Sequence, residues 1–243
     1  TLYFGRDTFT KILSSSGTAL GLVIIIEISG QISVIIDRMF LSKVDTGGIA
    51  ALSYASTIFT LPISVIALAF ATAIFPRLSE LASGERWSEL QSTFRQALDI
   101  SNFIFIPIAV VFYFFGDVII QLLYQRGRFD QEATHLTSSA LGFYAIGLVF
   151  MAGSGIVHKL MLGAGHTKVL SLMMISTVLI KVVGNLFLVP MMGFQGMALS
   201  SSVSYSLLFL MPFSYILLKH QMKFVPQFSI QFMLSLLSCT ISI

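Results

Sequence analysis

Residues 49–75 read IAALSYASTIFTLPISVIALAFATAIF, and this stretch contains no Asp, Glu, Lys or Arg. A helix of that length would measure about 40 Å, whereas the hydrocarbon core of a bilayer is about 30 Å thick. A strand of a membrane barrel would instead alternate polar and apolar residues over about 10 positions. The stretch therefore predicts a helix that crosses a membrane.

The same signal recurs along the whole chain. Hydrophobic residues make up 56% of the 243 positions and charged residues only 10%, whereas soluble domains carry about 25% charged residues. We predict an all-α, polytopic transmembrane helical bundle of about seven spans, forming a single domain over residues 1–243. The expected spans are residues 12–41, 49–75, 98–124, 136–162, 169–190, 196–218 and, cut short by the end of the chain, 227–243. Because the chain starts at Thr1 and stops inside an apolar run, we expect a fragment.

One connection, residues 77–97, is longer than the others. Trp87, Leu90, Phe94 and Ala97 recur there at helical spacing, with charged residues on the remaining surface. The pattern predicts an amphipathic cytoplasmic connector. A short helix lying on the membrane surface and a solvated linker both fit it.

The positive charges predict the orientation of the helices. Cytoplasmic loops carry an excess of Lys and Arg, and here alternate loops hold eight such residues on one side and three on the other. The eight are Arg6, Lys11, Arg77, Arg86, Arg95, Lys168, Lys219 and Lys223, and the three are Lys43, Arg126 and Arg128. We therefore place the N-terminus and the loops at 77–95 and 219–223 in the cytoplasm.

Several classes of site and partner find no support in the sequence. The basic residues are scattered, which argues against nucleic acid as a partner, and the single cysteine, Cys239, excludes an internal disulfide. The four histidines show no metal-ligand spacing, and no phosphate loop or nucleophile motif occurs. We expect neither an enzyme nor a bound metal or cofactor.

Polar residues inside the spans are the candidate functional residues, because a charge at membrane depth costs at least about 2.5 kcal/mol. Glu27, Gln31 and Arg38 fall within about 40° of one another on a helix. Ser29 and Ser33 point to the other side. The stripe predicts a helix that lines a water-filled cavity.

A plainer interpretation of the same helix stays open. Val34 interrupts the stripe, and Asp37 and Arg38 also suit the extracytoplasmic end of a helix. Glu27 would then be a buried residue satisfied by a neighbouring helix.

Three further cavity candidates lie in later spans. Lys181 and Asn185 are four residues apart near the middle of an apolar helix, where a lysine cannot easily reach the interface. Lys159 is nearer the end of its span, where extension of the side chain to the membrane surface also explains it. Together with the first helix these residues suit an amphiphile with an anionic head group, because Lys and Arg bind phosphate.

Three stretches carry a resemblance to a known family. Residues 76–100, 115–148 and 185–204, which include QRGRFD and NLFLVPMMGFQGMALS, resemble the MurJ (MviN) lipid II flippases of the multidrug/oligosaccharidyl-lipid/polysaccharide exporter superfamily. QISVIIDRMFLS, at 31–42, looks like the family's seventh helix. The resemblance implies a fold of about fourteen helices in two lobes, of which this chain is mainly the second. It also implies transport of a lipid-linked peptidoglycan precursor across the bacterial inner membrane.

The chain departs from the family at one position. Many members carry an arginine that faces the cavity after Tyr-Ala-(Asp or Asn), but here the string is Tyr54-Ala55-Ser56-Thr57. Either a cation elsewhere in the cavity compensates, or the substrate differs.

Three functions follow from these features. The leading hypothesis is a flippase that works by alternating access on a lipid II-like anionic precursor, with membrane lipids and cell-wall synthesis proteins as further partners. The first alternative is an ion-coupled exporter of small cationic compounds on the same fold, and the second is a membrane scaffold that does not transport.

Overall fold

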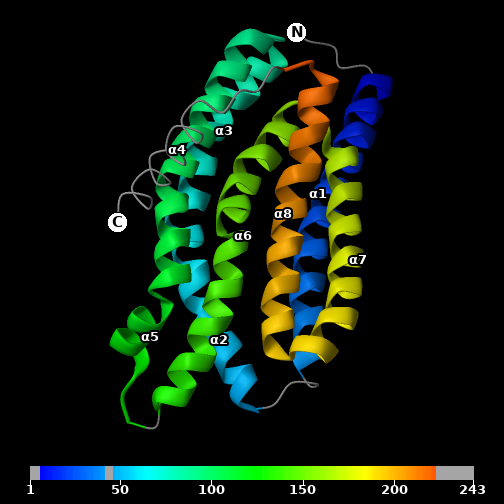
Figure 1. The fold of residues 1–243 in the computed structure, drawn as a ribbon. Helices are drawn as coiled ribbons and strands as arrows, with labels where there is room; N and C mark the ends of the chain where they lie inside the picture. Colours follow the sequence, from blue (N-terminus) through cyan, green and yellow to red (C-terminus); the bar gives the residue numbers. More distant parts are fainter. Residues whose placement is uncertain (1–5, 42–45, 128, 223–243) are drawn as a thin grey trace.

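The computed structural model describes residues 6–41, 46–127 and 129–222, with side chains from residue 20 onward except at 41–46. Every regular element in those ranges is helical. The elements are α1 (Arg6–Leu41), α2 (Thr46–Pro62), the π-helical turn η1 (Ile63–Ala67), α3 (Leu68–Ser83), α4 (Trp87–Phe114), α5 (Gly116–Tyr124), α6 (Gln131–Gly163), α7 (Thr167–Met192) and α8 (Phe194–Lys219). The long helices run alongside one another as a bundle (Figure 1).

Six helical stretches of the described chain are long and apolar enough to cross a membrane. They correspond in order to the first six predicted spans, and α2, η1 and α3 together make the second. The predicted all-α transmembrane fold is confirmed. The seventh predicted span, 227–243, lies outside the described residues.

Two spans are interrupted in ways that hydropathy does not reveal. Pro62 has no backbone N–H to donate within a helix, and directly after it the winding widens into η1, where Leu68 N–H bonds to the Ile63 carbonyl. The predicted span 98–124 is broken at Phe115, whose φ of −115° ends α4 before α5 begins. Both breaks lie inside spans whose average hydropathy is high.

The segment predicted as an amphipathic connector is divided between two long helices instead of forming a helix of its own. Residues 77–83 are the last turns of α3, and residues 87–97 are the first turns of α4. Between them Glu85 takes a positive φ of 53° in a tight turn. Leu90 and Phe94 are fully buried, because the apolar face of α4 packs against the bundle.

We call the end of the bundle that carries Arg77, Arg86, Lys168 and Lys219 the basic end, and the opposite end the far end. The basic end is at the top of Figure 1, where α3 turns into α4 and α8 finishes. The far end holds the start of α2, the α5–α6 loop and the α7–α8 turn.

Helix α6 lies at the centre of the bundle and packs against α2, α3, α4, α5 and α8. Small residues allow the close approach that membrane helices need: a Cβ placed on Gly147 would lie 2.8 Å from Ser202 Cα of α8. Helix α1 packs mainly on α7. The lobe is therefore built around one helix, with α1 at its edge.

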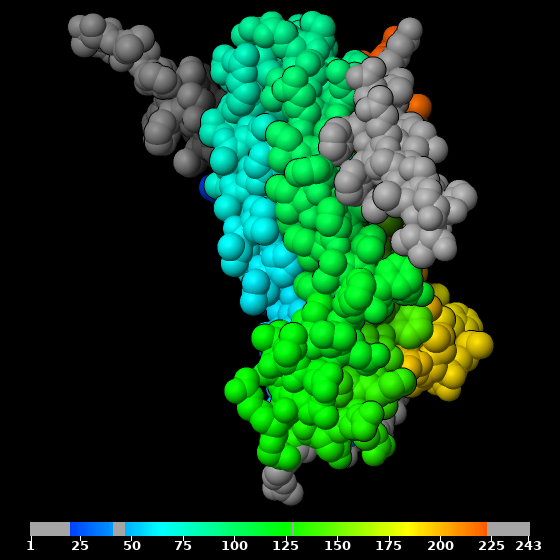
Figure 2. Space-filling model, turned by 60° about the vertical axis from the view of Figure 1, so that its left-hand side comes forward, coloured from blue at the N-terminus to red at the C-terminus, as the bar shows by residue number. Residues whose placement is uncertain are grey.

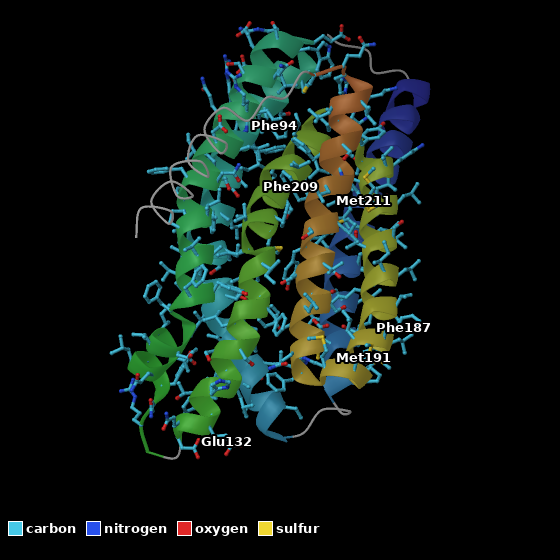
Figure 3. All side chains as sticks on the ribbon, in the orientation of Figure 1. Phe94, Glu132, Phe187, Met191, Phe209 and Met211 are labelled. Carbon is cyan, nitrogen blue, oxygen red and sulfur yellow. The ribbon has the colours of Figure 1, made fainter. Side chains whose placement is uncertain are left out.

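The outer faces of the bundle are apolar, as lipid contact requires. Phe187 and Met191 project outward from α7, whereas Phe94 and Phe209 point toward neighbouring helices (Figure 3). Figure 2 shows a second face, on which α3 and α4 lie side by side.

Candidate functional site

A cavity of about 510 Å³ lies inside the lobe, between α1, η1, α3, α6, α7 and α8. Ile63, Ala67 and Ala71 form part of its apolar wall. Its polar and charged lining residues are Glu27, Ser29, Ser33, Asp37, Ser154, His158, Lys159, Thr177, Lys181, Ser204 and Tyr205. Two carboxylates (Glu27 and Asp37) and two lysines (Lys159 and Lys181) therefore line one cavity within an apolar bundle.

An ion pair joins two walls of this cavity. Lys181 Nζ of α7 lies 2.6 Å from Asp37 Oδ2 of α1 and donates a second hydrogen bond to Ser33 Oγ at 3.0 Å. The Lys181 side chain is 4% exposed and the Asp37 side chain 28%. A buried lysine requires such a partner because an unpaired charge in this setting is costly.

Asn185 lies one turn beyond Lys181 and is completely buried. It does not line the cavity. Neither its amide oxygen nor its amide nitrogen has a hydrogen-bond partner in the described part of the chain, and the same is true of Asp37 Oδ1. An unmet buried polar group costs about 1–3 kcal/mol, so this level of the bundle is unusually polar for its surroundings.

Helix α6 contributes His158 and Lys159 to the cavity lining. His158 Nε2 donates to the Leu208 carbonyl at 2.9 Å, which fixes the orientation of the imidazole ring against α8. Lys159 Nζ lies 5.2 Å from the centroid of the Phe75 ring, within range of a cation–π interaction. Among the described residues, Lys159 forms no ion pair with a carboxylate, in contrast to Lys181.

The structure places the six predicted cavity residues differently. Glu27, Lys159 and Lys181 line the cavity, whereas Gln31 and Arg38 are exposed and lie outside its lining. Asn185 is buried behind Lys181. Whether any of the six binds substrate stays a prediction.

The face of α1 that meets the lobe carries Ser29, Ser33 and Asp37 rather than Gln31 and Arg38. The sequence pattern places the two serines on the side away from the polar stripe, and it leaves open whether Asp37 only marks the end of the helix. Two signals were available: the three residues recur at four-residue spacing, and Lys181 needed a carboxylate. Which helix supplied that carboxylate depended on packing between residues 144 positions apart.

The arginine that many family members carry is replaced by Thr57 on α2. The Thr57 hydroxyl bonds to the Ser53 carbonyl of its own helix at 2.8 Å, and Thr60 bonds to Ser56 in the same way at 2.7 Å. Neither residue lines the cavity. This part of α2 therefore supplies hydroxyl groups that are already bonded and no cation.

The described residues contain no group of three His, Cys, Asp or Glu side chains that could hold a metal ion.

A sequence model of the family described as "Lipid II flippase MurJ" matches residues 8–243, which is nearly the whole chain. The chain belongs to the MurJ family. Six spans and this membership make it part of a multi-pass protein of the bacterial inner membrane.

Curated relatives in the family carry the same description. The probable lipid II flippase MurJ of Bdellovibrio bacteriovorus is 25% identical over 174 residues, which cover 72% of this chain and 33% of that protein. The one from Rhizobium tropici is 31% identical over 118 residues, covering 49% of this chain and 22% of that protein. The chain spans about a third of the length of the first of these relatives.

Solved structures share the fold. One described as lipid II flippase MurJ in an inward closed conformation has a TM-score of 0.71 at 23% identity, covering 89% of this chain and 45% of that one. A MOP superfamily transporter from Pyrococcus furiosus also has a TM-score of 0.71, at 14% identity, covering 83% of this chain and 44% of that one. This chain therefore has the architecture of somewhat less than half of such a transporter.

Proposed function

We propose that the protein carries a lipid II-like precursor of the cell wall across the inner membrane by alternating access, and that this chain supplies mainly the second lobe. The observation that supports the proposal most is the charged cavity inside an apolar bundle, with Lys159 and Lys181 on its walls. Transfer of a free charged head group through hydrocarbon would be prohibitive. A cavity of this kind shields the head group while the lipid tail remains in the bilayer.

In this proposal Lys159 is the cation that meets the anionic head group first. Asp37 already neutralises Lys181, whereas the ammonium of Lys159 faces an aromatic ring that leaves its hydrogen-bond donors available. Lys181 would become available when α1 and α7 separate. The reaction is movement of a bound molecule without a change in covalent bonds, so we propose a transporter and not a catalyst.

The basic end lies in the cytoplasm in this proposal, as the distribution of Lys and Arg predicts. Membrane lipids surround the apolar outer faces, and cell-wall synthesis proteins are the partners expected on either side. In a background in which Cys239 is replaced by serine, a cysteine introduced for Glu85 should react with a membrane-impermeant reagent only from inside the cell. A cysteine introduced for Glu132, at the opposite end of the bundle, should react only from outside. The reverse pattern would overturn the orientation.

Depletion of the full-length protein tests the transport itself. Depleted cells should accumulate lipid-linked precursor on the inner leaflet and then lyse. The wild-type gene and Lys168→Gln, which changes an exposed lysine outside the cavity, should both restore growth and flipping. Lys159→Gln should restore membrane insertion but reduce flipping about tenfold, since a charge-assisted hydrogen bond contributes about 1.5–3 kcal/mol.

An exporter of small cations is the second candidate, and Glu27 favours it. Its carboxylate lines the cavity and forms no ion pair within the described residues. A cation exporter would lose activity with Glu27→Gln and retain it with Lys159→Gln. Depleted cells would then become sensitive to cationic drugs without accumulating precursor.

A further inference from the structure

A second groove lies at the far end of the bundle, between the start of α2 and the start of α6. Its volume is about 480 Å³. Tyr54 comes from α2, Phe129 and Asp130 from the loop before α6, and Glu132 and Thr137 from α6 itself. Figure 3 shows Glu132 at the tip of α6, and no residue lines both this groove and the cavity described above.

Thr137 is the residue that points to a ligand. It lines the groove yet is only 1% exposed, and its hydroxyl oxygen has no hydrogen-bond partner in the described part of the chain. A threonine in a helix usually bonds to the carbonyl four residues earlier, as Thr134 does with Asp130 at 3.0 Å. Because buried hydroxyl groups are rarely left unmet, a ligand in the groove would supply the missing partner.

Two carboxylates, those of Asp130 and Glu132, line the groove. Asp130 Oδ1 accepts from the Ala133 N–H at 2.9 Å and so caps α6, which leaves its second oxygen available. Glu132 is exposed, and its side chain forms no hydrogen bond or ion pair with the described part of the chain. Helix capping explains Asp130, but it does not explain the buried hydroxyl group on the same groove.

Aromatic rings form the opposite wall. The Tyr54 ring is 39% exposed and lies 4.7 Å from the Tyr124 ring and 5.2 Å from the Phe129 ring, centroid to centroid. These contacts hold Tyr54 in place. Aromatic rings attract cations through their negative faces, so the wall and the two carboxylates favour the same kind of ligand.

We propose that this groove binds a primary ammonium group. An ammonium has three N–H donors and no acceptor, so it suits a groove whose polar lining is Asp130, Glu132 and Thr137. An amine on the head group of the transported precursor would be its source, and that identification of the source rests on the proposed function. The groove would then hold the head group as it reaches the far side of the membrane.

Titration of the full-length protein in detergent with Nα-acetyl-lysine methylamide tests the proposal, with binding followed by NMR. The Nε-acetylated form of the same compound is the neutral control. The lysine compound should bind, and its Kd should rise about tenfold with Glu132→Gln or Thr137→Val. Glu85→Gln, the same change at the basic end, should leave Kd unaltered. Equal binding of the two compounds, no binding, or no effect of the two groove substitutions would overturn the proposal.

Thr137→Val also separates a binding role from a structural one. Loss of a hydroxyl without a partner should leave the melting temperature unchanged or raise it. A lower melting temperature with unaltered Kd would make the hydroxyl structural and end the proposal. This binding is measured without transport, so the two proposals can fail separately. If the depletion experiment fails, the groove remains an amine site with a different source of the amine. If the lysine compound does not bind, the flippase proposal is unaffected.

Discussion

Helices α6 and α1 are both long and apolar, yet they occupy opposite positions in the lobe. Within the apolar 18-residue window of each helix, 61% of the residues of α6 are buried but only 6% of the residues of α1. Glycines make the difference visible: a Cβ on Gly147 of α6 would collide with Ser202, whereas a Cβ on Gly21 of α1 would meet nothing within 4 Å. Hydropathy identifies both helices as spans, but close packing decides which of them is the core.

The largest effect is expected at the contact that ties the edge helix to the lobe. Lys181→Met leaves Asp37 without its partner, and breaking a buried ion pair costs about 3–5 kcal/mol. We expect a value near the lower limit, because Asp37 is 28% exposed. Hydrogen exchange should rise across α1 while α6 stays protected.

The double variant Asp37→Leu with Lys181→Met is the matched control for that substitution. Replacing both partners by apolar side chains removes the unpaired charge, so most of the lost stability should return. Equal destabilisation of the single and double variants would mean that the ion pair does not hold α1 in place.

A smaller effect is expected from adding one methyl group to each helix. Gly147→Ala forces a contact of 2.8 Å with the Ser202 backbone, and overpacking of this kind costs about 1–3 kcal/mol. Gly21→Ala should be neutral or stabilising by up to about 1 kcal/mol, since alanine is the better helix former. Thermal unfolding in detergent compares the two, and equal melting temperatures would contradict the contrast between the helices.

A pH effect is expected where α6 ends, at the basic end of the bundle. His166, in the turn after α6, has its Nε2 2.9 Å from Nε2 of His220, which stacks on Trp87 with centroids 3.9 Å apart. Burial, followed by the neighbouring positive charge of Lys219, lowers the pKa of His166. Burial, then His166, then Lys219 lower the pKa of His220.

The sign of that effect follows from proton linkage. The unfolded histidines, with a pKa near 6.5, bind protons more readily than the folded ones. Stability should therefore fall as the pH drops below about 6.5 and level off below the folded pKa values. Melting temperatures between pH 8 and pH 5 measure this, and His220→Gln should flatten the profile. An unaltered profile in that variant would assign the pH dependence to other groups.

The smallest effect is expected at the exposed charges of the α3–α4 turn. Arg77 pairs with Glu80 at 3.1 Å and with Glu89 at 3.7 Å, but all three side chains are about half exposed. Exposed ion pairs contribute about 0–1 kcal/mol and are weakened by salt. Arg77→Ala should lower stability by less than either buried substitution, and the loss should shrink at high salt. A loss comparable with that of Gly147→Ala would show that the turn is part of the core.

Hydropathy was sufficient to predict the helical fold and its six described spans, because each span must satisfy its backbone hydrogen bonds within lipid. It could not predict the break at Phe115 or the widened turn after Pro62, because an average over a whole span is insensitive to a single proline or glycine. Those features depend on backbone geometry, to which composition is insensitive.

The candidate site was predicted less completely than the fold. Lys181 was predicted as a cavity residue because a lysine in the middle of a span is costly unless it has a partner or water. Glu27 and Lys159 were predicted for the same reason. The face of α1 was misjudged, because Asp37 could be interpreted as a helix end and its partner lies on a helix far along the chain. The groove at Thr137 gave no sequence signal, since a threonine is ordinary in a membrane helix and only the fold shows that its hydroxyl is unmet.

The widened turn η1 decides which face of α3 meets the rest of the bundle. Because η1 holds one residue more than an α turn, every later side chain lies about 100° from where an unbroken α-helix of the same sequence would place it. That rotation brings Ala71 against Gly155 of α6 and keeps Leu78 completely buried. Val65, which is 65% exposed within η1, can accept other apolar side chains, and removal of one residue of η1 would let the turn close as regular α-helix while the packed face of α3 keeps its orientation.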